Sequence, residues 1–178
     1  MPGKCDRQAL VSSPELVSQE LLADEDFMRL ALAEATAAAL RGEVPVGAVV
    51  VAPDGRLLAR AGNRTIDPAD PTGHAEILAM REAARVLGNY RLTGATVYVT
   101  LEPCLMCAGA MVHARVGRVV YAATDPKSGA VTSLYRVGGD GLLNHSFEVT
   151  VGVLAEQAAE QLRSFFRERR RAPQIGEQ

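Results

Sequence analysis

Cysteine is scarce in this chain: there are three cysteines among 178 residues, and one of them, Cys5, lies in a polar N-terminal segment. A small, odd number of cysteines excludes a disulfide framework and indicates a reducing compartment. The sequence also lacks an apolar run long enough to span a bilayer, and its N-terminal segment lacks the apolar stretch of a signal peptide. We therefore expect a cytoplasmic protein with no membrane partner.

An excess of positive charge is also missing, since the formal net charge is −2. Residues 163–171, however, contain five arginines and a single acid, Glu168. Such a local patch can bind nucleic acid. It is also typical of a solvated helix end, where arginines match the negative end of the helix dipole. From the residues alone, the solvated helix end is the favoured interpretation.

A domain usually takes roughly 100–200 residues, so this chain is expected to form one. We place it at residues 24–171, between a flexible leader (1–23) and a flexible tail (172–178), with Asp24 capping the first helix. Strands alternate with helices in the second half, which predicts an α/β fold with parallel strands and helices on both faces of the sheet. Periodicity and turn residues predict helices at 24–41, 74–87, 103–114 and 154–171, and strands at 44–52, 56–63, 95–101, 118–123 and 147–152.

Two cysteines three residues apart, Cys104 and Cys107, directly follow a predicted strand and open a predicted helix. Alone, this spacing fits a redox dithiol as well as half of a metal site. A second helix opening carries His74, which completes a set of three ligands. A catalytic zinc typically has three protein ligands and keeps one position for water, whose pKa it lowers to roughly 7. A place in the first turn of a helix also favours the thiolate form of both cysteines.

Glu76 lies two residues after His74, and residues i and i+2 of a regular helix point to different sides. Glu76 therefore shares the site only if His74 is at the cap, before helical geometry begins. A carboxylate beside the metal, but not bound to it, is suited to moving a proton from water to a leaving group. His-x-Glu followed by Pro-Cys-x-x-Cys is the signature of zinc deaminases of nucleobases.

Beyond this signature, the chain resembles the bacterial tRNA-specific adenosine deaminases over nearly all of residues 24–171. The matching stretches include EVPVGAVVV, DPTGHAEI, NYRLTGATVYVTLEPCLMCAGAM, GRVVYAATDPKSGA and FFRERRR. The resemblance implies a three-layer α/β/α cytidine-deaminase-like fold with a five-stranded mixed sheet. It also implies a homodimer that converts the wobble adenosine of an arginine tRNA to inosine.

The resemblance also implies roles for individual residues. It makes His74, Cys104 and Cys107 the ligands of one Zn²⁺ and Glu76 the proton shuttle. It also changes our interpretation of the arginine-rich end of the last helix, which becomes an expected surface for the anticodon stem-loop. The residues that match substrate-binding positions are Asn63, Asp125, Lys127, Phe166 and Arg169.

Two alternatives remain open at this point. A deaminase of the same clan that acts on free guanine, cytosine or deoxycytidylate would carry the same zinc signature. Against it, the basic aromatic FFRERRR segment has no evident use for a small-molecule substrate. A zinc-stabilised RNA-binding module without catalysis is the other alternative. Against that, a structural zinc site normally has a fourth protein ligand and needs no spare carboxylate such as Glu76.

Overall fold

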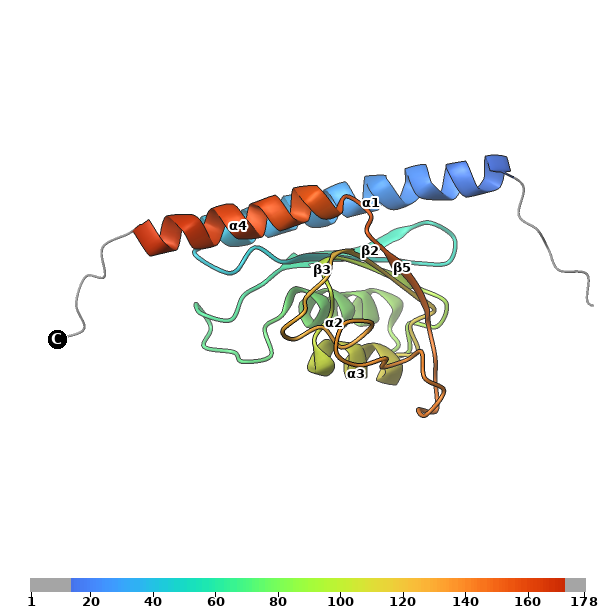
Figure 1. Ribbon diagram of the computed structural model, residues 1–178. Helices are drawn as coiled ribbons and strands as arrows, with labels where there is room; N and C mark the ends of the chain where they lie inside the picture. The colour runs from blue at the N-terminus through green and yellow to red at the C-terminus, as the bar shows by residue number, and fades with distance from the viewer. Residues whose placement is uncertain (1–13, 172–178) are drawn as a thin grey trace, which may run out of the picture.

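The structure, a computed structural model, describes the backbone of residues 14–171 and the side chains of residues 24–171. Over that range an N-terminal helix precedes a hairpin of two strands, the next two strands each follow a helix, and the last strand follows a long irregular connection and leads into the last helix (Figure 1). The helices are α1 (Pro14–Leu40), α2 (Ala75–Leu87), α3 (Leu105–His113) and α4 (Ala155–Arg171). The strands are β1 (Gly47–Val51), β2 (Leu57–Gly62), β3 (Thr96–Leu101), β4 (Arg118–Ala123) and β5 (Glu148–Val151).

The strands form one five-stranded mixed sheet in the order β2-β1-β3-β4-β5. β1 pairs antiparallel with both β2 and β3, whereas β3, β4 and β5 run parallel. β3 and β4 each follow a helix, whereas β5 joins the parallel half after an irregular connection. The parallel strands predicted for the second half of the chain are confirmed. The predicted five-stranded mixed sheet is confirmed as well.

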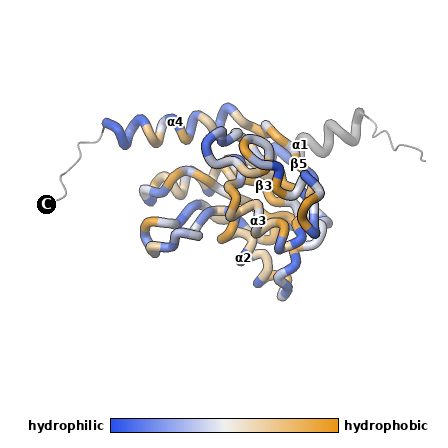
Figure 2. The backbone as a smooth tube through the Cα atoms, turned by 60° about the horizontal axis from the view of Figure 1, so that its bottom comes forward, coloured by the Kyte–Doolittle hydropathy of each residue, from blue (hydrophilic) through white to orange (hydrophobic). Residues whose placement is uncertain are grey.

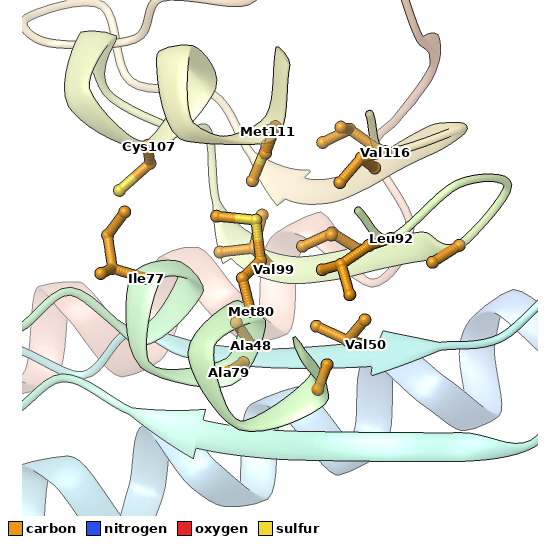
Figure 3. Close-up of a cluster of buried hydrophobic side chains, with 14 of the residues drawn as sticks. Ala48, Val50, Ile77, Ala79, Met80, Leu92, Val99, Cys107, Met111 and Val116 are labelled. Carbon is orange, nitrogen blue, oxygen red and sulfur yellow. The ribbon is translucent and has the colours of Figure 1, made fainter. Parts of the chain in front are cut away.

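The sheet is the middle of three layers, with α1 and α4 over one face and α2 and α3 over the other (Figure 1). Successive residues of a strand point to opposite faces, so each central strand supplies both cores. Val50 and Val99 pack with Met80 and Met111 beneath α2 and α3 (Figure 3). The opposite face of β1, β3 and β4 packs against α1 and α4, through Val49, Val51, Tyr98, Val120 and Ala122.

The first helix differs from the prediction. It begins at Pro14 and runs through Asp24, so Asp24 does not cap it. The Asp24 carboxyl group is instead buried in a pair with Arg118 of β4, at 2.6 Å, and accepts a hydrogen bond from the hydroxyl of Tyr98 at 2.8 Å. Residues 1–13 and 172–178 lie outside the described residues, so the flexible leader and tail stay predictions there, whereas the backbone of residues 14–23 belongs to α1.

No helix in the described part of the chain is long and apolar enough to cross a membrane.

Candidate metal centre and active site

The N-termini of α2 and α3 lie close together at one end of the sheet. His74 precedes the first turn of α2 with an extended backbone (φ −72°, ψ 146°), and Cys104 precedes α3 in the same way (φ −73°, ψ 173°). The expected start of α3 at Pro103 is therefore wrong, because the helix begins at Leu105. Cys107 lies in the first turn of α3, where its buried side chain points toward α2 beside Ile77 (Figure 3).

The three side chains predicted to meet do meet. The Sγ atoms of Cys104 and Cys107 each lie 3.6 Å from Nδ1 of His74. The three ligand atoms all lie within 4.8 Å of one another, and no other group of this kind occurs among the described residues. One imidazole and two thiols at this separation fit a zinc ion, which commonly binds nitrogen and sulfur together.

Hydrogen bonds within the cluster shift the pKa values of the two thiols in opposite directions. A hydrogen bond from Cys107 and a weaker one with His74 together lower the pKa of Cys104 to about 4, against the effect of burial. The hydrogen bond between the two thiols, together with burial, raises the pKa of Cys107. The hydrogen bond to Cys104 also raises the pKa of His74. The cluster therefore already favours one thiolate, the form of cysteine that binds metal.

Glu76 shares this site because His74 is at the cap, which decides between the two geometries that the sequence left open. The Glu76 side chain is 3% exposed, and burial raises the pKa of its carboxyl group. Its Oε2 atom is buried and has no hydrogen-bond partner among the described residues. A buried polar atom without a partner is costly, so Oε2 indicates a group that Glu76 meets when the site is filled.

A cavity of about 300 Å³ opens onto this cluster. This volume is at the lower end of small-molecule sites in proteins. His74, Glu76 and Cys104 form one part of its lining, and the rest comes from other segments of the chain. These other residues are Val44, Val46, Asn63, Thr65, Leu101, Glu102, Asp125 and Ser128.

Asn63 lies in this lining and has a structural partner there. Its Oδ1 accepts a hydrogen bond from the backbone N–H of Ala75 at 2.9 Å. His74 makes no side-chain capping bond of its own, so Asn63 satisfies a free N–H at the start of α2 from a distant segment. With Oδ1 engaged, the amide nitrogen of Asn63 is the donor left for a ligand.

Asp125 and Lys127 contribute to two different cavities. Asp125 lines the cavity of Glu76, and its Oδ1 accepts hydrogen bonds from the N–H groups of Lys127 (2.9 Å) and Ser128 (3.2 Å). Lys127 lines a second, wider cavity of about 560 Å³, together with Phe166 and three arginines of α4 (Arg163, Arg167 and Arg170). The Phe166 side chain is 41% exposed.

Arg169 does not join that second cavity. Its guanidinium donates to the carbonyl of Gly42 at 3.0 Å and lies 5.0 Å from the ring centre of Phe165. The end of α4 is hydrophilic throughout (Figure 2), but part of its charge is neutralised within the helix. Glu160 pairs with Arg163 at 2.9 Å and with Arg167 at 2.7 Å.

Two buried acids near the site were missed in the sequence, Glu43 and Glu102. Glu43 is 1% exposed and accepts hydrogen bonds from the hydroxyl of Thr65 (3.0 Å) and the N–H groups of Ile66 (2.8 Å) and Asp67 (3.4 Å). Burial works to raise the pKa of Glu43, but these hydrogen bonds together hold it below its usual value. Their positions in the sequence could have indicated a buried role, because each acid flanks an apolar strand of the sheet.

Comparison with known proteins agrees with this site. Residues 22–123 match the family described as the cytidine and deoxycytidylate deaminase zinc-binding region. The tRNA-specific adenosine deaminase of Agrobacterium fabrum is 52% identical over 144 residues, which are 81% of this chain and 94% of that protein. The enzyme of the same name from Haemophilus influenzae is 47% identical over 152 residues, which are 85% and 88% of the two chains.

A solved structure from a study of A-to-I editing by tRNA:A34 deaminases at the wobble position of transfer RNA is 50% identical to this chain. It superimposes with a TM-score of 0.74 and covers 77% of this chain and 99% of its own. Sequence and structure therefore agree that the chain belongs to the family of tRNA-specific adenosine deaminases, a family of hydrolytic enzymes within the zinc-binding cytidine and deoxycytidylate deaminase group.

Proposed function

We propose that the protein deaminates the wobble adenosine in the anticodon loop of an arginine tRNA by hydrolysis, which converts it to inosine. The observation that carries this proposal is the buried Glu76 carboxyl group, which has an unpartnered oxygen. It shares one cavity with His74 and Cys104, two members of the His74, Cys104 and Cys107 cluster. A structural metal site would need no such carboxyl group. Membership of the family supports both the deamination and the RNA substrate.

In this proposal His74, Cys104 and Cys107 hold one zinc ion. When bound, zinc makes a water molecule more acidic and so supplies a nucleophile near neutral pH. Glu76 takes the proton of the water that adds to C6 of adenine. It then delivers that proton to the departing amine, which leaves as ammonia. Burial of Glu76 suits both steps, because it keeps the proton-accepting oxygen away from bulk solvent.

The cavity binds the adenine after the base has left the stack. Extrusion costs a few kcal/mol from a duplex and less from a loop, which suits an anticodon loop. Asn63 is held rigidly by its bond to Ala75, and its amide nitrogen donates a hydrogen bond to the base. Asp125 contacts the same nucleotide from the other segment of the cavity lining.

Outside the cavity, Lys127, Phe166 and Arg170 bind the neighbouring nucleotides. Proteins read single-stranded RNA by stacking bases on aromatic rings and pairing phosphates with cations, and this surface offers both. Arg169 lies on Phe165 and Gly42 instead, so its contact with RNA remains a prediction. Because the substrate is tRNA, we assign the reaction to the cytoplasm.

We further propose that two copies associate through the face where α2 and α3 meet. An open cavity of about 290 Å³ on this face has mainly apolar walls, and Tyr90 at its edge is 59% exposed. Val86 and Leu87, at the end of α2, are exposed as well. Exposed apolar side chains that lie close together mark association sites. The apolar and small residues of the cavity are Ile77, Met80, Ala84, Leu92, Ala110 and Ala114.

The dimer is tested by its mass in solution. Sedimentation at micromolar concentration should give twice the chain mass; a single-chain mass at that concentration would contradict the dimer.

The proposed reaction is tested by inosine formation. Zinc-loaded protein is incubated with an arginine anticodon stem-loop that carries a wobble adenosine, and Glu76→Gln is assayed alongside. General acid–base catalysis contributes roughly 10²–10⁴-fold, so Glu76→Gln should lose at least that factor while it keeps its zinc. No inosine from the unaltered protein, with zinc present and the RNA intact, would overturn the proposal in favour of a free-base or nucleotide substrate.

A further inference from the structure

Glu102 is a buried acid whose partners all lie on one segment outside the metal centre. It directly follows β3, and it is 3% exposed. Its Oε1 accepts hydrogen bonds from the N–H groups of Val131 (3.2 Å), Thr132 (2.8 Å) and Ser133 (2.9 Å). Its Oε2 accepts from the N–H of Asp125 at 3.0 Å and from the hydroxyl of Ser133. Both oxygens act as acceptors, as in an ionised carboxylate.

These donors belong to residues 125–133, in the connection between β4 and β5. Two backbone contacts help to hold the same segment beside the start of α3. The N–H of Ala130 donates to the carbonyl of Pro103 at 2.8 Å, and Gly129 pairs with Cys104 in a short antiparallel bridge. The segment therefore lies on the residues that join β3 to the metal centre.

The position of this segment shapes both cavities. It brings Asp125 and Ser128 into the lining of the cavity that contains Glu76, and Lys127 into the lining of the second cavity. Apart from Asp125, the groups proposed to act on the base lie elsewhere. A displacement of the segment would therefore change how the substrate is bound more than it would change the reacting groups.

Gly129 shows how closely the segment lies on Glu102. A Cβ atom added at Gly129 would lie 2.4 Å from the carboxyl group of Glu102 and 2.5 Å from the carbonyl oxygen of Asp125. Both distances are well below van der Waals contact. Any larger residue would have to push the segment away from the carboxyl group, so this position offers a second way to disturb the same contact.

We propose that Glu102 is a positioning residue of the deaminase, which holds the segment 125–133 as the substrate-binding wall of the active site. It acts through Asp125 and Ser128 rather than on the reacting atoms. This proposal rests on the proposed function. A glutamine at this position would keep the shape but turn an NH₂ group toward at least one N–H donor, so a hydrogen bond would be replaced by a repulsive contact.

The experiment uses Glu102→Gln, with Glu82→Gln as the control, because Glu82 is an exposed acid of α2 paired only along its own helix, with Arg85. We expect Glu102→Gln to keep its zinc and to raise KM for the stem-loop at least about tenfold, while kcat changes less than about threefold. We expect hydrogen exchange of the amides of Asp125 and of residues 131–133 to become at least about tenfold faster. Glu82→Gln should change none of these quantities.

If Glu102→Gln does not fold, Gly129→Ala tests the same contact, since it leaves every donor and acceptor in place. It should give the same rise in KM and the same faster exchange. Unchanged exchange of these amides, or a loss confined to zinc content or kcat, would overturn the proposal. If the unaltered protein made no inosine, the proposed function would fail, and amide exchange would still decide whether Glu102 holds the segment.

Discussion

Asn63 serves two partners with one amide group. Its oxygen accepts the N–H of Ala75 at the start of α2, and its nitrogen is the proposed donor to the base. Because the two atoms have separate tasks, substitutions can separate the stability of the helix from the binding of the substrate.

We predict that Asn63→Asp keeps the melting temperature close to that of the unaltered protein but loses most deaminase activity. Aspartate retains an acceptor for Ala75, and its charge suits a helix N-terminus, but it has no amide donor. Asn63→Ala should lose activity too, and should also lower the free energy of unfolding by about 0.5–2 kcal/mol, the usual cost of a lost helix cap. Thermal melts and inosine assays on both variants make the comparison. Full activity in Asn63→Asp would show that the base does not need this donor.

At the scale of elements, Glu43 ties the connection between β2 and α2 to the connection between α1 and β1. Its carboxyl group accepts hydrogen bonds from Thr65, Ile66 and Asp67, and Thr65 lines the active-site cavity. This connection also carries Asn63 at its start and His74 at its end. Glu43 thus supports one wall of the site as Glu102 supports another.

We predict that stability conferred by Glu43 depends on pH. Its pKa is depressed in the folded protein, so its contribution is complete above the unfolded pKa and is lost as the pH falls through the folded pKa. Glu43→Gln should therefore lower the free energy of unfolding at pH 7, by roughly 1.5–3 kcal/mol for hydrogen bonds to a charged group. The difference should shrink at pH values below about 4. Denaturant unfolding at several pH values tests this, and a difference that is independent of pH would contradict it.

At the scale of the whole molecule, the arginine-rich end of α4 divides into cations with different partners. Arg163 and Arg167 pair with Glu160, and Arg169 lies on Gly42 and Phe165. The line of five arginines in the sequence is therefore not one uniform basic surface. The cavity that α4 forms with Lys127 is the part best placed to meet an RNA that enters the active site.

We predict that Lys127→Ala and Arg170→Ala each weaken stem-loop binding and reduce the slope of log K against log salt by about 1, as expected when one phosphate contact is lost. Arg169→Ala should lower the melting temperature, because Arg169 lies on Gly42 and Phe165, and it should change the RNA affinity only slightly. Arg29→Ala, in an exposed ion-pair cluster on α1, is the control and should leave the binding unchanged. Titrations at several salt concentrations provide the test. An unaltered slope in Arg170→Ala would exclude Arg170 from phosphate binding.

The sequence by itself determined the elements and the chemical groups of the site. Strand and helix periodicity are local properties, so the individual strands and helices could be predicted to within a few residues, apart from the start of α1. The mixed pairing of the strands was implied only by the resemblance to a known family. The spacing of His74, Cys104 and Cys107 at two helix openings, each after a strand, predicted that they would meet. They do meet because β2 and β3, the strands before these openings, run in the same direction on either side of β1. For Glu76 the sequence left two geometries open, and the extended backbone of His74 decided between them.

Only the tertiary structure decided which polar groups support the site. Asp24 appeared to be a helix cap because its neighbours in sequence suggested one, yet it pairs with Arg118 in the middle of the fold. Glu102 has partners in the connection between β4 and β5, and Asn63 has its partner at the first residue of α2, so both bond to residues that are distant in sequence. Such contacts leave no periodic pattern, since they form only after packing has brought the segments together. They depend on the assembled fold, whereas helices and strands depend mainly on neighbours along the chain.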